Sequence, residues 1–310
     1  MRARLLHAVR DPSRAGRRVR GVPRAGLFLT GDRAASRTAL GVAYLRAAHQ
    51  LLDAEPRVLD DEPIVRILGP DAIARLKEHP EQVQTPSARQ LRAHVVLRSR
   101  FAEDRLADAV RRGVRQYVLL GAGLDTFALR QPEWAKHIRI VEIDQPATQA
   151  KKRARLDELG IVAPPNVGYR PVDFETTTLR DALPAAGVDV GAPVFFSWLG
   201  VTMYLTEDAV DEVLRTVAQL PRGTEIVLTF ATPPDPKEEP ARISFAQRAA
   251  EAGEPWITFF APEALEERLR AFGFTTVTFL TPEVARERYF SHRADGLEAP
   301  RRVSVVSAIV

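Results

Sequence analysis

Two glycines and an acidic residue at the end of a short apolar run have the spacing of a ligand-binding turn. Gly121 and Gly123 end the apolar run at 117–120, and Asp125 follows them. Glycine lets the backbone turn sharply and lets a ligand lie against it without an intervening Cβ. A strand that ends in such a turn is how open α/β sheets bind nucleotide-like ligands at their carboxyl edge. Taken alone, Gly-x-Gly fits an ordinary tight turn equally well.

Two acidic residues at the end of the next apolar run suit a ribose. Residues 138–143 read as a strand, and Glu142 and Asp144 share a face because side chains alternate along a strand. Asp144 lies 21 residues after Gly123. An acidic residue about 20 residues beyond the glycine turn binds the ribose hydroxyls in dinucleotide folds. Capping of the following helix is the alternative interpretation of Asp144.

A third strand, expected over 166–172, ends at Asp173 and Phe174. This pair suits an adenine, because the Asp173 carboxylate can accept from the exocyclic amine while the Phe174 backbone N–H meets a ring nitrogen. An Asx turn at the strand end is the alternative. The three strand ends together predict a site for a nucleotide-like ligand.

Four segments resemble the S-adenosylmethionine-dependent methyltransferases of the leucine carboxyl methyltransferase type. They are 118–126, 141–146, 172–175 and 195–205, and the similarity extends from roughly residue 36 to the C-terminus. The resemblance implies a seven-stranded, Rossmann-like class I α/β sheet and S-adenosylmethionine as the cofactor. It places cofactor contacts at Gly121, Ala122, Gly123, Asp125, Glu142, Asp144, Asp173, Phe174 and Leu199.

The resemblance also assigns Arg98 to the methionine carboxylate of the cofactor. A planar guanidinium can grip a carboxylate with two parallel hydrogen bonds. Arg37, near the first predicted helix, is a weaker candidate for the same task.

The sequence departs from the family pattern at two positions. Many members have Glu where this chain has Leu199, and Arg where it has Phe127. The missing Glu removes any cofactor contact that its side chain makes in other members. The two changes also indicate an acceptor site unlike that of the leucine carboxyl methyltransferases themselves.

The predicted reaction is methyl transfer to a carboxylate or hydroxyl of a small molecule, as in secondary metabolism. No residue is marked as a general base. Tyr204 is the weak catalytic candidate, with His94 and His49 as further possibilities, and a structural role is the favoured reading of each. Two alternatives stay open: a methyltransferase-like binding protein without turnover, and an NAD-dependent Rossmann oxidoreductase. The latter normally shows Gly-x-Gly-x-x-Gly, whereas the third position here is Thr126.

The elements that must position these residues follow from periodicity and from capping signals, which include Thr85 and Thr206 as predicted helix caps. Helices expected at 32–54, 71–77 and 87–111 precede every strand, so residues 31–112 are predicted to form a helical cap that can cover the cofactor. The α/β core occupies 113–310, with further strands at 193–198, 225–230, 274–280 and 302–310, the last two as an antiparallel edge pair. An inserted helix is expected near 241–252. Beyond it, Trp256, Phe259 and Phe260 either line the acceptor site or pack in the core.

Composition sets limits on partners and compartment. The 310 residues include no cysteine, which excludes disulfides and thiolate metal sites and suits a reducing, cytoplasmic location. No apolar run approaches the roughly 20 residues of a membrane helix. Residues 1–30 hold eight arginines and one aspartate, so they carry +7 and residues 31–310 carry −3; we expect a basic, disordered leader. We therefore expect no nucleic-acid partner, no membrane and no metal; the oligomeric state is open.

Overall fold

The computed structural model describes residues 37–173, 176–233, 246–247, 249–251, 253–291 and 293–310. The predicted leader at 1–30, Phe174 and much of the predicted helix at 241–252 lie outside the described residues. The described residues form one compact unit. None of the described helices combines the length and the hydrophobicity of a bilayer-spanning segment.

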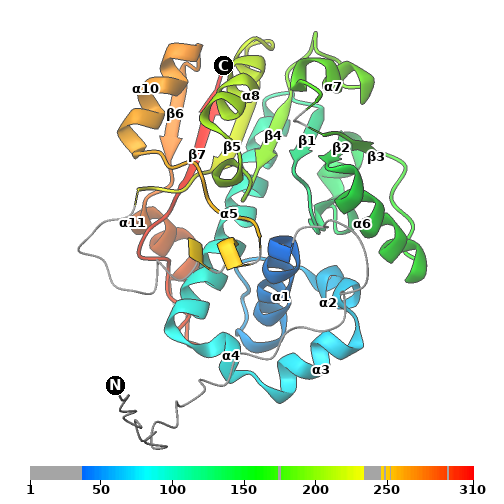
Figure 1. Cartoon of the computed structure of the whole chain (residues 1–310), viewed down its shortest axis with the longest axis vertical. Helices are drawn as coiled ribbons and strands as arrows, with labels where there is room; N and C mark the ends of the chain where they lie inside the picture. The colour runs from blue at the N-terminus through cyan, green and yellow to red at the C-terminus, as the bar shows by residue number, and fades with distance from the viewer. Residues whose placement is uncertain (1–36, 174–175, 234–245, 248, 252, 292) are drawn as a thin grey trace, which may run out of the picture. The chain divides into compact units, whose positions relative to one another are not determined.

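Seven strands form one mixed sheet in the order β3-β2-β1-β4-β5-β7-β6 (Figure 1). The strands are β1 (Gln116–Leu120), β2 (Arg139–Asp144), β3 (Val167–Pro171), β4 (Phe195–Trp198), β5 (Glu225–Thr229), β6 (Thr276–Phe279) and β7 (Val305–Ile309). The first five run parallel, and β7 is antiparallel to both β5 and β6. The predicted seven-stranded α/β sheet is confirmed, including the antiparallel pairing of the last two strands.

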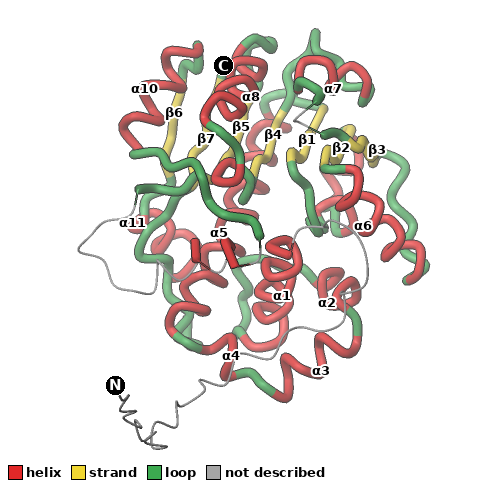
Figure 2. Tube along the Cα trace, in the orientation of Figure 1, coloured by secondary structure: helices red, strands yellow, loops and turns green. Residues whose placement is uncertain are grey.

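Helices cover both faces of the sheet, and a group of helices precedes the first strand (Figure 2). The helices are α1 (Arg37–Leu52), α2 (Glu62–Leu68), α3 (Pro70–Glu78), α4 (Glu81–Gln84), α5 (Pro86–Arg111), α6 (Pro146–Glu158), α7 (Leu179–Ala185), α8 (Glu207–Ala218), α10 (Pro262–Phe272) and α11 (Pro282–Ala285). Three short 3-10 helices are described, η1 (Phe127–Leu129), η2 (Glu133–His137) and η3 (Thr202–Tyr204), together with a short π-helix, η4 (Arg286–Phe290). The predicted caps Thr85 and Thr206 are confirmed, since each side chain accepts a backbone N–H from the first turn of α5 or α8.

Alternation along the central strands divides the core into two layers. Val118 and Leu120 of β1 pack in a cluster with α7, α8 and α10, whereas Tyr117 and Leu119 pack in a second cluster with α5. β1, β4 and β5 are buried at every position because helices cover both of their faces. The same burial leaves only the strand ends free to contact a ligand.

The helices before β1 form a third apolar cluster. This cluster joins α1, α2, α3 and α4 to Val95 in the first half of α5. The second half of α5 packs against β4 and β5, with Phe101 and Leu106 in the sheet-facing cluster. The sequence predicts a cap separate from the sheet layers. In the structure, α5 instead packs both in the cap and against the sheet.

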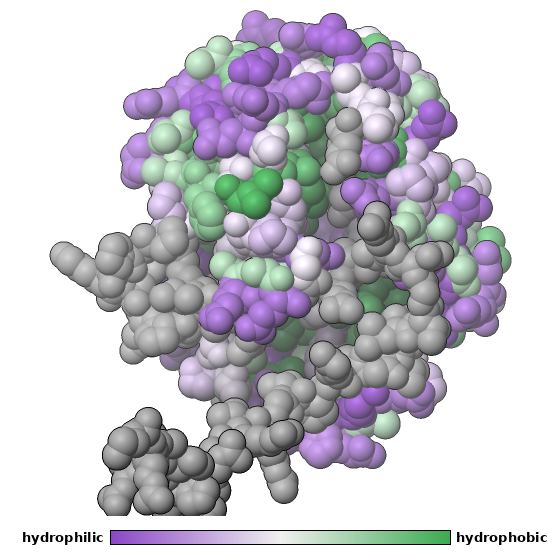
Figure 3. All heavy atoms as spheres, in the orientation of Figure 1, coloured by the Kyte–Doolittle hydropathy of each residue, from purple (hydrophilic) through white to green (hydrophobic). Residues whose placement is uncertain are grey.

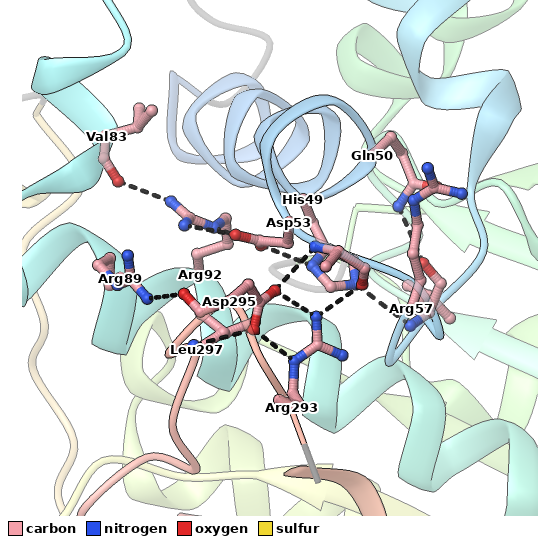
Figure 4. Close-up of polar contacts among 12 residues, drawn as sticks. His49, Gln50, Asp53, Arg57, Val83, Arg89, Arg92, Arg293, Asp295 and Leu297 are labelled. Atoms are coloured by element: carbon pink, nitrogen blue, oxygen red, sulfur yellow. Dashed lines mark hydrogen bonds and ion pairs between the residues drawn. The ribbon is translucent and has the colours of Figure 1, made fainter.

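A buried polar network joins α1 to α5 (Figure 4). The fully buried Arg92 of α5 donates to both carboxylate oxygens of Asp53, at 2.8 and 2.9 Å, and to the Val83 carbonyl at 2.6 Å. The other contact of Asp53 is His49 Nδ1, at 2.7 Å, and His49 Nε2 accepts from the Leu59 backbone N–H. Both ring nitrogens of His49 are therefore engaged in packing the cap.

The segment before β7 is clamped to the loop that follows α1, as Figure 4 also shows. Arg293 donates to the carbonyls of Pro56 at 2.6 Å and Ala54 at 2.8 Å, and it pairs with Asp295. The Asp295 carboxylate accepts from the backbone N–H of Ala54 at 2.8 Å. Residues more than 230 positions apart thereby hold the cap against the C-terminal part of the chain.

Candidate functional site

The turn after β1 has the backbone conformation that its glycines predict. Gly121 and Gly123 have φ values of +66° and +52°, in the left-handed region that favours glycine. The N–H groups of Gly121 and Ala122 both donate to the Ile143 carbonyl, at 2.8 and 3.3 Å, which ties the turn to the end of β2. A Cβ at Gly121 would lie 2.5 Å from Val201 Cγ2. The turn therefore sits close beneath the loop that follows β4.

Asp144 is held at the same turn. Its Oδ2 accepts from the Gly123 N–H at 2.5 Å, and its Oδ1 accepts from the Gln145 N–H at 2.7 Å. Burial is the largest influence on its pKa, which is raised although the two backbone hydrogen bonds oppose this. The Gln145 contact does not cap α6, because Gln145 is itself the N-cap residue and no side chain caps this helix. The Asp144 side chain is half-buried beside Gly123, where the predicted ribose would lie.

Glu142 lies beneath the turn, apart from Asp144. Its side chain is 1% exposed, and its Oε2 is 2.5 Å from Nζ of the equally buried Lys152 of α6. Lys152 Nζ also donates to the Asp125 carbonyl at 2.6 Å. Glu142 thus supports the turn through Lys152. A contact between Glu142 and a cofactor stays a prediction. The burial of the Glu142 side chain does not favour such a contact.

The other residues predicted for the cofactor lie at the same edge of the sheet. Asp125 Oδ1 accepts from the Phe127 N–H at 2.8 Å. Burial opposes its ionisation, but the positive charges of Arg46, Arg130 and Lys152 outweigh burial and lower its pKa. Asp173 follows β3 and is half-buried. Phe174, next to it, lies outside the described residues, so the predicted adenine contacts stay predictions.

Arg98 lies against the loop after β4. A Cβ at Gly200 would be 2.8 Å from Arg98 Nη1, so the guanidinium occupies the space that this glycine leaves. Within the described chain, the guanidinium has no hydrogen bond or ion pair. Burial lowers its pKa to about 10, and nearby Tyr204 and Asp125 counteract that shift. Arg98 therefore stays cationic at neutral pH.

His94 lies one helical turn before Arg98 on α5. Burial lowers its pKa to about 3, and the positive charge of Arg98 adds to the effect. The imidazole is therefore neutral at physiological pH. A group with so low a pKa is a weak general base, because proton transfer is most effective when the pKa is near the working pH.

Tyr204 contacts the segment that was predicted to wall the acceptor. Its hydroxyl accepts from the Trp256 indole N–H at 3.2 Å, and the Ile257 N–H donates to the Met203 carbonyl at 2.8 Å. Ile257 is 53% exposed, whereas Phe260 is 4% exposed and belongs to the core. Figure 3 shows a hydrophilic surface over α7, α8 and α10, with hydrophobic residues gathered below these helices. The structure thus keeps Trp256 beside Tyr204 and next to Phe259, at a ring-centroid distance of 6.5 Å, and buries Phe260.

The start of α1 covers the glycine turn. A Cβ at Gly123 would lie 3.5 Å from the Ala39 Cβ. Thr38 donates to Glu254 Oε2 from its backbone N–H, at 3.1 Å, and from its hydroxyl. The first turn of α1 is therefore held between the glycine turn and the segment that carries Trp256. Its role as a cap over a bound cofactor stays a prediction.

Comparison with known proteins identifies the family. Residues 39–218, more than half of the chain, match the leucine carboxyl methyltransferase family. The chain belongs to this family.

Relatives agree with that assignment. The "Putative S-adenosyl-L-methionine-dependent methyltransferase YktD" of Bacillus subtilis is 32% identical over 240 residues, which are 76% of this chain and 79% of the relative. A protein of the same description from Mycobacterium marinum is 35% identical over 237 residues, covering 72% of this chain and 74% of the relative. As a family member, the protein is an S-adenosylmethionine-dependent methyltransferase, and S-adenosylmethionine is its cofactor.

Two solved structures share the fold. A putative methyltransferase from Thermobifida fusca is 20% identical, with a TM-score of 0.51 over 86% of this chain and 92% of the other. A DUF574 family protein from Streptomyces avermitilis is 16% identical, with a TM-score of 0.52 over 87% of this chain and 95% of the other. At these identities the likeness concerns the fold alone. The oxidoreductase alternative gains no support from the family or from these relatives.

The two departures from the family pattern have different surroundings in this methyltransferase. Leu199 is partly buried against the α5-facing core cluster. Phe127 is 1% exposed, and its ring meets Tyr117 edge-on at a centroid distance of 5.3 Å. Phe127 is thus a core residue, and it supports the glycine turn by packing. Leu199 as a cofactor contact stays a prediction.

Sequence reasoning missed three residues that hold the glycine turn from outside. Arg46 of α1, Asp61 of the loop before α2 and Lys152 of α6 are all buried, and all contact residues 124–126 or their partners. No local motif marks them, because each is an ordinary charged residue until the fold buries it. Across the described residues, no group of three metal-binding side chains occurs.

Proposed function

We propose that this methyltransferase methylates a carboxylate or hydroxyl oxygen of a small molecule, of the kind made in secondary metabolism. The observation that carries the proposed cofactor site is the Arg98 guanidinium. It is a half-buried cation with no hydrogen bond or ion pair within the described chain, and it lies beside Gly200. Taking a charge out of water is costly unless an opposite charge is bound. The carboxylate of the methionine moiety is a suitable partner, and Arg98 can hold it with two hydrogen bonds.

The remaining residues fit the rest of the cofactor. The Asp144 carboxylate, fixed at Gly123, is placed to accept from ribose hydroxyls. Asp173 and the Phe174 backbone are proposed for the adenine. Gly121, Ala122 and Gly123 supply backbone without bulk, and Asp125 keeps its charge beside them. When bound, S-adenosylmethionine supplies a methyl group carried on a positively charged sulfur.

The residues of the chain contribute mainly by orientation. Holding two reacting groups in line contributes about 7–11 kcal/mol to catalysis. Tyr204 is proposed to touch the acceptor, because its oxygen accepts from Trp256 and its own proton remains free to donate. A carboxylate acceptor needs no base. A hydroxyl acceptor would gain about 10²–10⁴ in rate from one, and neutral His94 is a weak candidate.

Calorimetric titration with S-adenosylmethionine, and separately with NAD, tests the cofactor site. We expect binding of S-adenosylmethionine only, and an Asp144→Asn variant that binds it 10-fold or more weakly. Loss of hydrogen bonds to a charged group costs about 1.5–3 kcal/mol. Asp157→Asn, an exposed change on α6, is the matched control and should bind as the wild type does. A folded wild-type protein that binds NAD, or binds neither ligand, would sink the proposal.

Turnover separates an enzyme from a binding protein of the same fold. The measurement is release of S-adenosylhomocysteine, by mass spectrometry, in mixtures with panels of small carboxylic acids and phenols. Tyr204→Phe should lower kcat with little change in cofactor affinity. Equal kcat in both proteins would remove Tyr204 from the acceptor site.

A further inference from the structure

Arg46 of α1 contacts residues 124–126, the loop directly after Gly123. Arg46 Nη2 donates to the Thr126 hydroxyl at 2.8 Å, and Nη1 donates to the Leu124 carbonyl at 3.4 Å. Its Nη1 also lies 3.8 Å from the Asp125 carboxylate. One side chain of the cap thus contacts three consecutive residues of the loop that borders the cofactor site.

Asp61 is the nearest counter-ion of the buried Arg46 guanidinium. Its side chain is 0% exposed, and its Oδ2 lies 2.6 Å from Arg46 Nη2. The Thr126 hydroxyl donates to Asp61 Oδ1, and Arg130 Nε lies 3.5 Å from the same oxygen. Asp61 therefore contacts the loop directly at Thr126 and also acts on the loop through Arg46.

The backbone around Asp61 is set by α1. The Asp61 N–H donates to Gln50 Oε1 at 2.9 Å, and Gln50 Nε2 donates to the Leu59 carbonyl at 2.9 Å. Gln50 lies one helical turn after Arg46 on α1. The same helix consequently places both members of the Arg46–Asp61 pair.

We propose that Asp61 is a positioning residue of the cofactor site, which holds residues 124–126 in the binding conformation through Thr126 and Arg46. This inference rests on the proposed cofactor site at the glycine turn. Without Asp61, the guanidinium of Arg46 would be a buried cation without its nearest counter-ion. An uncompensated buried charge is strongly destabilising, so the guanidinium would move toward other acceptors or water. The remaining acceptors of Arg46 are the Thr126 hydroxyl, the Leu124 carbonyl and the Asp125 carboxylate, all in the loop, so the loop would shift. Cofactor affinity should then fall although Asp61 touches no ligand.

A matched pair of variants tests the proposal. Asp61→Asn and Asp53→Asn each remove one buried negative charge from the cap. The Asp53 side chain is 3% exposed and pairs with Arg92 at 2.8 Å and with His49 at 2.7 Å (Figure 4). Both changes should lower the thermal midpoint. Calorimetry with S-adenosylhomocysteine, below both midpoints, should show at least tenfold weaker binding for Asp61→Asn and binding within twofold of wild type for Asp53→Asn.

Thr126→Val supplies a second route if Asp61→Asn fails to fold. The valine keeps the volume but removes the hydroxyl that Arg46 and Asp61 share. We expect the same loss of affinity, and a double variant no weaker than the single ones, because both act on one loop.

Two results would overturn the inference while leaving the proposed function intact. One is wild-type affinity in Asp61→Asn or, failing that variant, in Thr126→Val. The other is an equal loss of affinity in Asp53→Asn, which would indicate a general effect of the cap. Absence of binding by the wild-type protein would instead overturn the cofactor site, and this inference with it.

Discussion

At Gly121 the backbone passes within van der Waals contact of the loop after β4. The residue combines a positive φ of +66° with a Cβ position only 2.5 Å from Val201 Cγ2. Two separate costs therefore oppose any side chain there, one from backbone strain and one from contact. Asp144 depends on the same conformation, because the Gly123 N–H that it accepts is two residues further on.

Comparison of Gly121→Ala with a control variant should separate the cost of backbone strain from the cost of the Val201 contact. Gly160→Ala is the control, since Gly160 has φ +63° and nothing within 4 Å of its Cβ position. We expect each change to cost roughly 1–2 kcal/mol for the left-handed conformation. Gly121→Ala should cost about 1–3 kcal/mol more through overpacking. Urea unfolding measures both, and adding Val201→Ala should recover the difference. Equal losses in the two single variants would show that Val201 yields freely.

At the scale of elements, helix α5 links the cap to the sheet. Its first half carries Arg92, which binds Asp53 directly after α1, and its second half packs on β4 and β5. Arg98 lies between these halves, beside Gly200. The clamp of Arg293 and Asp295 ties the segment before β7 to the loop after α1, so the cap is held at two ends.

Acid should weaken that clamp. Although burial opposes ionisation of Asp295, hydrogen bonds from Arg293, Ala54 and Leu297 hold its pKa well below the usual range. A carboxyl with a depressed folded pKa stabilises above its unfolded pKa of about 4, and that stability is lost as pH falls toward the folded pKa. The free-energy gap between wild type and Asp295→Asn, measured in urea, should be on the order of 1 kcal/mol at pH 7 and should shrink below pH 4. Asp157→Asn, at an exposed position, should give no such trend; parallel curves for wild type and Asp295→Asn would contradict the prediction.

At the scale of the whole described unit, two apolar layers share one sheet. Alternate residues of β1 belong to different clusters, and α5 contributes to both the sheet-facing cluster and the cap cluster. The cap is thus joined to the core through α5. Cofactor bound beneath α1 would stabilise the cap and the sheet together.

This sharing predicts a single unfolding transition. The three tryptophans, Trp134, Trp198 and Trp256, all lie after β1, so their fluorescence reports the α/β part, whereas far-UV circular dichroism reports all helices. The two thermal midpoints should coincide. Excess S-adenosylhomocysteine at 100 times its dissociation constant should raise both, since it adds about 2.7 kcal/mol. Circular dichroism that melts before fluorescence would show that the cap unfolds alone.

Local pattern determined much of this protein. The apolar runs predict the central strands because parallel strands are buried on both faces, and the Thr85 and Thr206 caps predict helix starts because the cap depends on three or four residues. Residue type also permits the positive φ angles at Gly121 and Gly123, because glycine has no Cβ. Each of these inferences needs only neighbours along the chain.

Tertiary structure alone decided how charged residues are used. Glu142 and Asp144 share a strand and a face, yet Lys152 buries one while Gly123 holds the other at the site. Arg46 and Asp61 reach Thr126 across 80 and 65 residues, and their sequence shows no motif. Contacts of this kind depend on which helix faces pack together, and the free energy of a charged side chain depends on the burial and partners that packing creates.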